Sequence, residues 1–375
     1  MELFKQKVIL LTGAAGSVGQ ELIRQLIPLK PAEIRAVDNN ETALFFLGEQ
    51  YRHNSPLTIH LGDVRDARKL EDLCQGVDIV LHLAAFKHVG LSEQNPFEAV
   101  KTNVLGVRNV IQAAHRAGVE RVLFTSSDKA VNPTNVMGIT KLMGERLMTA
   151  ANLEMGGQGP RFSSVRFGNV MGSRGSVLPL FVAQIRQGGP VTVTDANMTR
   201  FVMALPDAVH LVLKACTLSC GGEVFVTKMP VMRILDLARA MIELLGPCHG
   251  YDPEDIAIRI TGIRPGEKLY EELLSEEEMG RALELQQMFV VLPSLPELAA
   301  KVRYRYADKL EFASCRRPYM SSREIPLTLE EIKQFLLTHR LLEPGLPEDS
   351  GRQWEVEVGT TPYYVLNEMA TVLKA

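Results

Sequence analysis

In the first third of the chain, short apolar runs typical of strands alternate with segments whose apolar residues have the spacing of a helix. Residues 7–12 (KVILLT) form a short aliphatic run, and a glycine-rich turn leads from it into the helical pattern QELIRQLI at 20–27. Three further apolar runs, at 33–38, 57–66 and 77–85, each end in polar or small residues. Strands that alternate with helices are typical of a parallel sheet covered by helices. We therefore predict an α/β fold with a Rossmann-like, doubly wound parallel sheet.

The turn after the first run has the composition of a dinucleotide-binding site. Gly13, Gly16 and Gly19 follow a G-x-x-G-x-x-G spacing, which lets the backbone turn tightly and approach a pyrophosphate. The backbone N–H groups at the start of the helix, at Ser17 and Val18, then face the phosphates. Three glycines also occur in loops for turn geometry alone, so the strand–turn–helix context gives the pattern its weight.

Residues at the ends of the next strands complete this expected site. Asp38 stands where an acid that binds the adenosine ribose is expected, and its carboxylate would repel a 2′-phosphate, so NAD is favoured over NADP. Asp38 could also, or instead, cap the following helix. We expect Asp63 and Val64 to contact the adenine end of the cofactor, and Ala84 and Ala85 to lie beneath it. Alternatively, these four residues are ordinary strand ends.

Composition narrows the class of protein. With 375 residues, 46% of them hydrophobic, the chain can bury a large core with an appended lobe. The 41 Lys and Arg against 44 Asp and Glu give a net charge of −3, so we expect no nucleic-acid partner. Five cysteines without CxxC spacing indicate reduced thiols and a cytoplasmic location. The eight histidines show no metal-ligand spacing, and no apolar stretch is long enough for a membrane span.

The order of the motifs suggests three segments. We expect an NAD-binding domain with the catalytic segment at 1–165, and a smaller, interleaved substrate-binding lobe at 166–280. The remaining segment, 281–375, reads as a partly irregular extension in which 327–339 (LTLEEIKQFLLTH) forms one short amphipathic helix.

A cluster of polar residues follows the last strand of the first half. The run RVLFTSS at 121–127 ends in Ser127 and continues into Asp128 and Lys129, at the end of the strand where an open α/β sheet places its ligands. Each of the three also has a structural interpretation, because a serine can bond to backbone, an aspartate can cap a turn and a lysine can be a solvated surface charge.

The glycine spacing and the segment that ends in Lys141 resemble the extended short-chain dehydrogenase/reductase superfamily. There, a Y-x-x-x-K helix follows the strand; the lysine lowers the pKa of the phenol and holds the nicotinamide ribose, while the phenolate moves a proton. Here the same frame reads M-G-I-T-K, with Met137 in place of the tyrosine. A thioether has no ionisable proton. Either catalysis has been lost, or another group has taken it over.

Four longer runs, at 82–110, 126–141, 165–201 and 260–274, are similar to the polysaccharide-biosynthesis sugar-nucleotide dehydratases. More narrowly, they resemble the catalytic domain of the UDP-N-acetylglucosamine 4,6-dehydratases of the capsule and O-antigen type. The branch of that family that includes membrane-anchored members has methionine at the tyrosine position.

This chain departs from the family pattern in two places. Gly90 and Ser92 alter the loop after Lys87 and His88, and Ser127 stands in the place of a threonine. The second change keeps the hydroxyl group. The first puts detailed substrate contacts of that loop in doubt.

The resemblance implies NAD-dependent dehydration of a UDP-N-acetylhexosamine: oxidation at C4, elimination of the C5 proton and the C6 hydroxyl, and return of hydride to C6. It assigns the C5 proton to Lys129, protonation of the C6 hydroxyl to Asp128, and a hydrogen bond to the C4 oxygen to Ser127. Burial and the nearby cations Lys141 and Lys87 would have to lower the pKa of Lys129 by about three units. The base for the C4 hydroxyl stays open between Asp128, a water and Lys141.

The resemblance also implies the substrate contacts and the partners. The R-P-G-E-K stretch at 264–268 is expected to contact the substrate; alternatively, it is a surface turn in which Arg264, Glu267 and Lys268 form salt bridges with one another. We expect a homo-oligomer, dimer or higher, with the helix at 141–152 either in the core or in the interface. The alternative functions are a nucleotide-sugar C4 or C5 epimerase and a non-catalytic NAD and nucleotide-sugar binding protein. The expected contacts to the UDP-sugar are Lys87, His88, Asn169, Arg174, Arg200, Arg264, Glu267 and Lys268.

Overall fold

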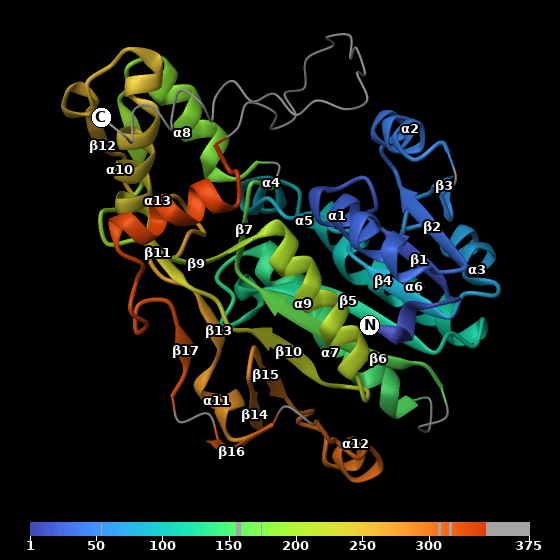
Figure 1. Cartoon of the computed structure of the whole chain (residues 1–375). Coiled ribbons are helices and arrows are strands. Elements are labelled where there is room, and N and C mark those ends of the chain that lie inside the picture. The colour runs from blue at the N-terminus through green and yellow to red at the C-terminus, as the bar shows by residue number, and fades with distance from the viewer. Residues whose placement is uncertain (54, 155–158, 174, 307–308, 315–316, 343–375) are drawn as a thin grey trace.

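The computed structural model describes residues 1–342 except 54, 155–158, 174, 307–308 and 315–316. Ten strands of these residues form one sheet, in the order β16-β14-β15-β10-β6-β5-β4-β1-β2-β3 (Figure 1). The strands from β10 to β3 are parallel, and β15, β14 and β16 extend the sheet by antiparallel pairing. The predicted α/β fold with a mostly parallel sheet is confirmed. The strands are β1 (Val8–Thr12), β2 (Glu33–Asp38), β3 (Leu57–Leu61), β4 (Ile79–His82), β5 (Arg121–Ser127), β6 (Arg161–Phe167), β10 (Val224–Thr227), β14 (Ala282–Leu285), β15 (Met288–Val291) and β16 (Lys309–Ser314).

Each face of the sheet has its own hydrophobic core. Ile9 and Leu11 of β1 belong to a cluster with side chains of α1 and α9, whereas Leu10 belongs to a cluster with side chains of α3, α6 and α7. Because successive side chains of a strand point to opposite faces, a strand covered on both faces is apolar throughout. The helices around the sheet are α1 (Ser17–Leu26), α2 (Glu41–Gln50), α3 (Ala67–Cys74), α6 (Gly106–Arg116), α7 (Val136–Glu154) and α9 (Leu205–Leu218).

A second lobe, at the upper left of Figure 1, has a smaller core. It contains the sheet β11-β9-β7, the pair β12-β8 and three helices, and Phe181, Met241 and Leu336 belong to its apolar cluster. Its elements are β7 (Asn169–Met171), α8 (Val177–Arg186), β8 (Val191–Val193), β9 (Thr199–Ala204), β11 (Val231–Arg233), α10 (Ile234–Leu245), β12 (Ile258–Ile260) and α13 (Leu329–Thr338).

The helix predicted at 327–339 is present as α13 and packs on α10. A capping box begins it: the Thr328 hydroxyl accepts from the N–H of Glu331 at 3.3 Å, and the Glu331 carboxylate accepts from the N–H of Thr328 at 2.8 Å. Such a box satisfies two backbone donors that the first turn of a helix leaves free. Its apolar residues Ile332 and Leu336 are buried in the core of the second lobe.

The chain crosses between the two lobes more than once. Strands β10, β14, β15 and β16 return to the main sheet after the second lobe has begun, and α13 comes back to the second lobe. The domain bounds 1–165, 166–280 and 281–375 remain predictions, and 343–375 lie outside the described residues. The remaining elements are α4 (Val89–Gln94), α5 (Pro96–Val100), α11 (Glu276–Met279), α12 (Pro296–Lys301), β13 (Glu272–Leu274), β17 (Tyr319–Met320), the π-helix η3 (Lys101–Leu105) and the 3-10 turns η1 (Glu2–Phe4), η2 (Ile27–Leu29), η4 (Asp128–Ala130), η5 (Pro247–His249) and η6 (Pro253–Asp255).

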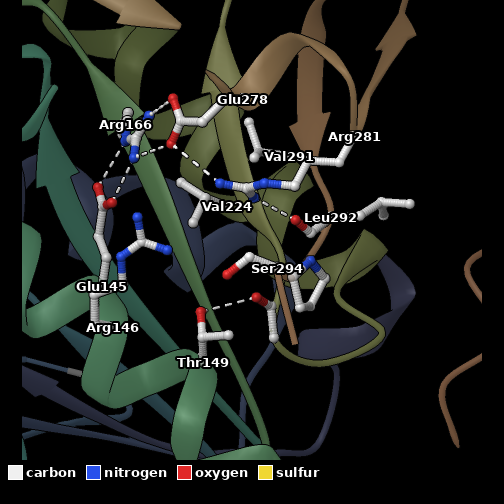
Figure 2. Close-up of a pocket in the computed structure, with 12 residues that line it drawn as sticks. Glu145, Arg146, Thr149, Arg166, Val224, Glu278, Arg281, Val291, Leu292 and Ser294 are labelled. Atoms are coloured by element: carbon white, nitrogen blue, oxygen red, sulfur yellow. Dashed lines mark hydrogen bonds and ion pairs between the residues drawn. The ribbon is translucent and has the colours of Figure 1, made fainter. Parts of the chain in front are cut away.

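A buried ion-pair network joins α7, β6 and α11. Figure 2 shows the Arg166 guanidinium between the carboxylates of Glu145 and Glu278. It donates to Glu145 at 2.7 and 2.6 Å and to Glu278 at 2.8 and 2.8 Å. Burial alone would raise the pKa of Glu278, but Arg166 outweighs it and lowers this pKa to about 2. The network therefore holds α7 and β6 against α11, the helix that follows β13.

No helix in the described part of the chain combines the length and the apolar character that a bilayer span requires.

Candidate active site

The glycine turn after β1 lies against the loop that follows β4. Gly13 has a φ of +72°, and a Cβ atom there would lie 2.8 Å from the backbone nitrogen of Ala84. A Cβ atom at Gly19 would collide with the carbonyl oxygen of Gly13. The hydroxyl of Thr12 accepts from the N–H of Ala84 at 3.3 Å and also bonds to the ring of His82 at 2.7 Å. These contacts leave room for backbone only, the condition for a close approach of a pyrophosphate.

Helix α1 begins at Ser17, directly behind this turn, with Gly16 as its N-cap residue. The first N–H groups of an α-helix have no partner within the helix and, with the helix dipole, attract anions. Gly16, Ser17 and Val18 therefore stand where the sequence predicted phosphate contacts. The residues present fit a dinucleotide.

Asp38 ends β2 beside the same turn. Its carboxylate accepts from the N–H of Ala15 at 3.0 Å and from the N–H of Asn40 at 3.0 Å. The cap of α2 is Asn40, whose side chain accepts from the N–H of Ala43 at 2.9 Å. The N-cap of α2 is therefore Asn40 and not Asp38. Asp38 instead holds the glycine turn against the end of β2.

Asp63 and Val64 follow β3 at the outer end of the site. Hydrogen bonds from Arg65 lower the pKa of the Asp63 carboxyl, which also accepts from Asn39 at 3.3 Å. Val64 is buried, and a Cβ atom at Gly106 would lie 2.8 Å from its side chain. Their contacts to adenine, and that of the half-buried Ala85 to the cofactor, stay predictions.

The three polar residues at the end of β5 form one hydrogen-bonded group. The Ser127 hydroxyl donates to Asp128 Oδ1 at 2.6 Å, and Lys129 Nζ donates to the same oxygen at 3.0 Å. The backbone N–H of Lys129 donates to it as well, at 2.9 Å. Asp128 is fully buried, and its Oδ2 has no hydrogen-bond partner among the described residues. A buried carboxylate with one free oxygen is suited to exchange a proton with a ligand.

Lys129 faces a second carboxylate that sequence reasoning missed. Its Nζ lies 3.5 Å from Glu271 Oε1, and Arg200 Nε lies 3.6 Å from that oxygen. Burial alone would lower the pKa of Lys129, but attraction to Asp128 and Glu271 outweighs it, so this pKa is raised. The expected fall of the Lys129 pKa was therefore wrong for the ligand-free protein. The only sequence signal of Glu271 was an acidic pair at the end of the fourth motif.

Met137 and Lys141 lie one turn apart on α7 and are both buried. Lys141 Nζ donates to the carbonyl oxygen of Thr125 at 2.9 Å and lies 4.6 Å from the centre of the Phe124 ring. Burial lowers the pKa of Lys141 to about 8, although Glu145 opposes this. An amine with this pKa is partly neutral near physiological pH and can act as a base.

The Lys141 amine should make stability depend on pH. Its pKa falls from 10.5 to about 8 on folding, so between these values the unfolded chain binds more protons and stability rises with pH. The slope can approach about 1.4 kcal/mol per pH unit. Urea unfolding from pH 7 to 10.5 should show this rise in the wild type relative to Lys141→Gln. Parallel curves for the two proteins would contradict the shifted pKa.

The segment that contains Glu271 is tied to the turn after β5. Asn135 donates to the carbonyl oxygen of Gly266 at 3.0 Å, Lys268 Nζ donates to the carbonyl oxygen of Val131 at 2.9 Å, and Asn132 donates to the Glu272 carboxylate at 2.6 Å. Residues 266–272 therefore lie over the turn that follows β5.

Three of the expected substrate residues join this arrangement: Arg200, Glu267 and Lys268. Arg200 is buried and donates to the carbonyl oxygens of Thr199 and Lys268, both at 2.8 Å. Its NH2 also lies 3.7 Å from Glu267 Oε1. The structure thus places Arg200 and Lys268 in contacts within the protein, and their roles toward a substrate stay predictions.

The other expected substrate residues lie around this centre. Arg264 is exposed, and its backbone N–H donates to the Glu267 carboxylate at 3.2 Å. The R-P-G-E-K stretch is thus a turn, and among the described residues no ion pair joins the side chains of Arg264 and Glu267. Asn169 donates to the carbonyl oxygen of Phe201 at 3.2 Å. Lys87 and His88 are exposed in the loop before α4. Arg174 lies outside the described residues.

Among the described residues, no three or more His, Cys, Asp or Glu side chains lie close enough together to hold a metal ion.

Comparison with known proteins places the chain in a family. The model of the family described as polysaccharide biosynthesis protein matches residues 9–293. An uncharacterized membrane protein of Methanocaldococcus jannaschii is 54% identical over 290 residues, 77% of this chain and 87% of the relative. A UDP-N-acetylglucosamine 4,6-dehydratase (inverting) of Campylobacter jejuni is 39% identical over 296 residues, 78% of this chain and 85% of the relative. A UDP-glucose 4-epimerase of Rickettsia typhi is 37% identical over 343 residues, which is 90% of this chain and 97% of the relative.

Two observations on length and structure complete the comparison. The chain spans only 46% of two longer relatives, a probable polysaccharide biosynthesis protein of Bacillus subtilis and a capsular polysaccharide biosynthesis protein of Staphylococcus aureus. The crystal structure of Pen from Bacillus thuringiensis, at 40% identity, superposes with a TM-score of 0.82 over 91% of this chain and 99% of Pen. The chain therefore belongs to the polysaccharide biosynthesis protein family.

Proposed function

We propose that this protein dehydrates a UDP-N-acetylhexosamine, with UDP-N-acetylglucosamine as the favoured substrate, to the UDP-4-keto-6-deoxy sugar. The observation that supports this most is the group of Ser127, Asp128 and Lys129, held together at the end of β5 next to a helix whose tyrosine position is Met137. This group can supply the proton transfers that Met137 cannot. The name of the Campylobacter jejuni relative supports the choice of substrate.

The proton transfers balance within this group. When bound, NAD would take hydride from C4 and return it to C6. The Lys129 ammonium passes a proton to Asp128 along their 3.0 Å hydrogen bond, which leaves a neutral amine beside a protonated acid. Asp128 then protonates the C6 hydroxyl, which leaves as water, and Lys129 takes the C5 proton. The pair is then back in its starting state, so the elimination needs no outside acid or base. When hydride returns to C6, the Lys129 ammonium gives a proton back to C5, and the proton removed from the C4 hydroxyl replaces it on the pair.

The oxidation at C4 needs a separate base. We assign it to Lys141, because burial lowers its pKa to about 8 and its neutral form is accessible near physiological pH. Ser127 holds the C4 oxygen in this assignment, and Lys141 takes the hydroxyl proton directly or through a water.

Mass spectrometry of the purified protein with UDP-N-acetylglucosamine tests the proposal. A product lighter by one water molecule, formed without net consumption of NAD, supports dehydration. An Asp128→Asn variant should form none of it, because an amide cannot protonate the leaving hydroxyl.

A C4 or C5 epimerase is the second candidate. The Rickettsia typhi UDP-glucose 4-epimerase favours it, since that relative is 37% identical over 90% of this chain. An epimerase would leave the mass of the sugar unchanged and invert one centre, which NMR of the product detects. If neither the mass nor the stereochemistry of the sugar changes, the result favours the non-catalytic binding protein.

We propose NAD rather than NADP as the cofactor, because the Asp38 carboxylate stands at the tip of β2 beside the glycine turn. The Asp38→Asn variant removes the charge that repels a 2′-phosphate and keeps the side-chain size. We expect the preference for NAD over NADP to fall by roughly tenfold or more, the worth of one charge-assisted hydrogen bond. Calorimetric titration with each cofactor measures it. A preference equal to that of the wild type would place the ribose elsewhere.

Two further expectations belong to the same proposal. We propose a homo-oligomer whose interface includes the exposed apolar side chains Phe97, Val100, Ile139 and Met143 of α5 and α7. Light scattering of the purified protein measures its molar mass in solution.

We also propose a cytoplasmic location, where nucleotide sugars are made.

A further inference from the structure

A buried carboxylate, Glu271, lies beside the catalytic lysine. Only 2% of its side chain is exposed. Its Oε1 lies 3.5 Å from Lys129 Nζ and 3.6 Å from Arg200 Nε, and its Oε2 has no hydrogen-bond partner in the described part of the chain. Burying a carboxylate is costly unless it is paired and hydrogen-bonded, so its presence at this position calls for a physical reason.

The backbone of Glu271 is fixed from two sides. Its N–H donates to the Ser321 hydroxyl at 2.9 Å, and its carbonyl oxygen accepts from the N–H of Ser321 at 2.8 Å. On the other side, Lys268 and Glu272 bond to the turn that follows Lys129. The carboxylate therefore points at Lys129 from a rigid support and not from a free loop.

Arg200 is the second cation beside Glu271, but most of its donors are directed elsewhere. The NH1 and NH2 groups of Arg200 donate to the carbonyl oxygens of Thr199, Lys268 and Leu269. Only Nε faces Glu271, and the distance of 3.6 Å is longer than a hydrogen bond. Lys129 lies at a similar distance from Glu271, 3.5 Å, and it also contacts a second buried carboxylate, Asp128, at 3.0 Å.

We propose that Glu271 is a positioning residue of the reaction: its carboxylate aligns the Lys129 ammonium on Asp128 and decides how readily that ammonium gives up its proton. The inference rests on the proposed base role of Lys129. The charged groups that face this pair are Asp128 of η4, Arg200 of β9, and Lys268 of the segment over the turn. Of these, Asp128 raises and Arg200 lowers the pKa of Lys129, and Glu271 adds to the effect of Asp128.

The test compares Glu271→Gln with wild type in the full chain loaded with NAD. The amide keeps the shape and removes the negative charge, so the neutral amine of Lys129 becomes easier to form. NMR of protein with ¹³C-labelled lysine side chains follows this titration directly, with the signal assigned by its absence in Lys129→Met. We expect the Lys129 midpoint to fall by about one pH unit or more. In the proposed reaction the Lys129–Asp128 pair must hold one proton, so kcat falls where Lys129 loses its proton to solvent. This falling limb of kcat against pH should move to lower pH by the same amount, with KM within about twofold of wild type.

Two controls separate this role from a structural one. Glu272→Gln removes the same charge from the next residue, which bonds to Asn132, and should leave the Lys129 midpoint in place. Glu271→Asp keeps the charge but withdraws it by one methylene, and should give a smaller shift in the same direction. It also serves if the Gln variant does not fold.

The outcomes are distinct from those of the proposed function. If no dehydration occurs in wild type but the Lys129 midpoint falls in Glu271→Gln, the reaction is wrong and the pairing of Glu271 with Lys129 is right. If the midpoint is unchanged in Glu271→Gln, or in Glu271→Asp where the Gln variant is unfolded, the inference about Glu271 is overturned, whatever the substrate.

Discussion

Replacing Lys129 with methionine should lower kcat for dehydration by about 10²–10⁴-fold, the usual contribution of a general acid or base. Methionine keeps most of the volume and removes the amine that takes the C5 proton. The Asp128 carboxyl also loses the partner at 3.0 Å with which it exchanges a proton. Binding of the UDP-sugar should change little, because the phosphates and the uridine contact other residues in the proposed site. Rates of water loss and calorimetric titration measure the two quantities.

Lys333→Met is the matched control for Lys129→Met. Lys333 of α13 also lies between two carboxylates, Glu243 at 2.6 Å and Glu330 at 2.7 Å, but it belongs to the second lobe. Its loss should leave kcat unchanged. Turnover at the wild-type rate in Lys129→Met would show that the base of the elimination is another group.

Replacing Arg166 with methionine should lower the free energy of unfolding by about 3–5 kcal/mol, the cost of leaving buried charges without their partner. The Arg166 side chain is 2% exposed, and it alone bridges Glu145 and Glu278, which are 3% and 6% exposed. Without the guanidinium, Glu145 loses its ion pair, and Glu278 keeps only the more distant Arg281 at 3.9 Å and its bonds from Ser275. Urea unfolding at pH 7 measures the loss.

The loss should depend on pH with a defined sign. Arg166 lowers the pKa of Glu278 to about 2 in the folded protein, so its contribution is fully present above the ordinary pKa of 4.5 and is lost as the pH falls toward 2. The difference between wild type and Arg166→Met should therefore shrink between pH 4.5 and 2. A constant difference over this window would mean that Glu278 is not the carboxylate affected.

Two variants check the physical reason for the loss. Arg161→Met changes an exposed arginine on the same strand and should cost less than about 1 kcal/mol. Adding Glu145→Gln and Glu278→Gln to Arg166→Met removes the stranded charges and should restore part of the stability. A loss in Arg166→Met no larger than in Arg161→Met would contradict the account of the network.

The parts of the fold that depend on local pattern could be predicted from the sequence. The apolar run at 7–12, the glycine turn and the following helix are β1, the tight turn at Gly13 and α1, because short-range sterics and period decide them. The polar group at 126–129 was also predicted, since its residues are neighbours in the chain. The sequence similarly predicted the helix at 327–339 from its amphipathic pattern, and α13 confirms it.

Contacts between distant segments could not be predicted in the same way. Glu271 reaches Lys129 only because residues 266–272 fold over the turn after β5, and no local pattern records that contact. The expected fall of the Lys129 pKa was wrong because burial was foreseen, whereas the attraction to Asp128 and, beyond it, to Glu271 was not taken into account. The donation of Arg200 to the carbonyl oxygens of Thr199 and Lys268 could not be predicted for the same reason, and its expected contact to the UDP-sugar stays a prediction.

The central claim is that hydride leaves C4 and returns to C6 while water is lost, and an isotope label tests it most directly. The purified protein would be incubated with UDP-N-acetylglucosamine that carries deuterium at C4, and the product examined by mass spectrometry and NMR. The account predicts a product lighter by one water molecule, with the deuterium in its C6 methyl group. Deuterium that remains at C4, in a sugar of unchanged mass, would contradict the dehydration.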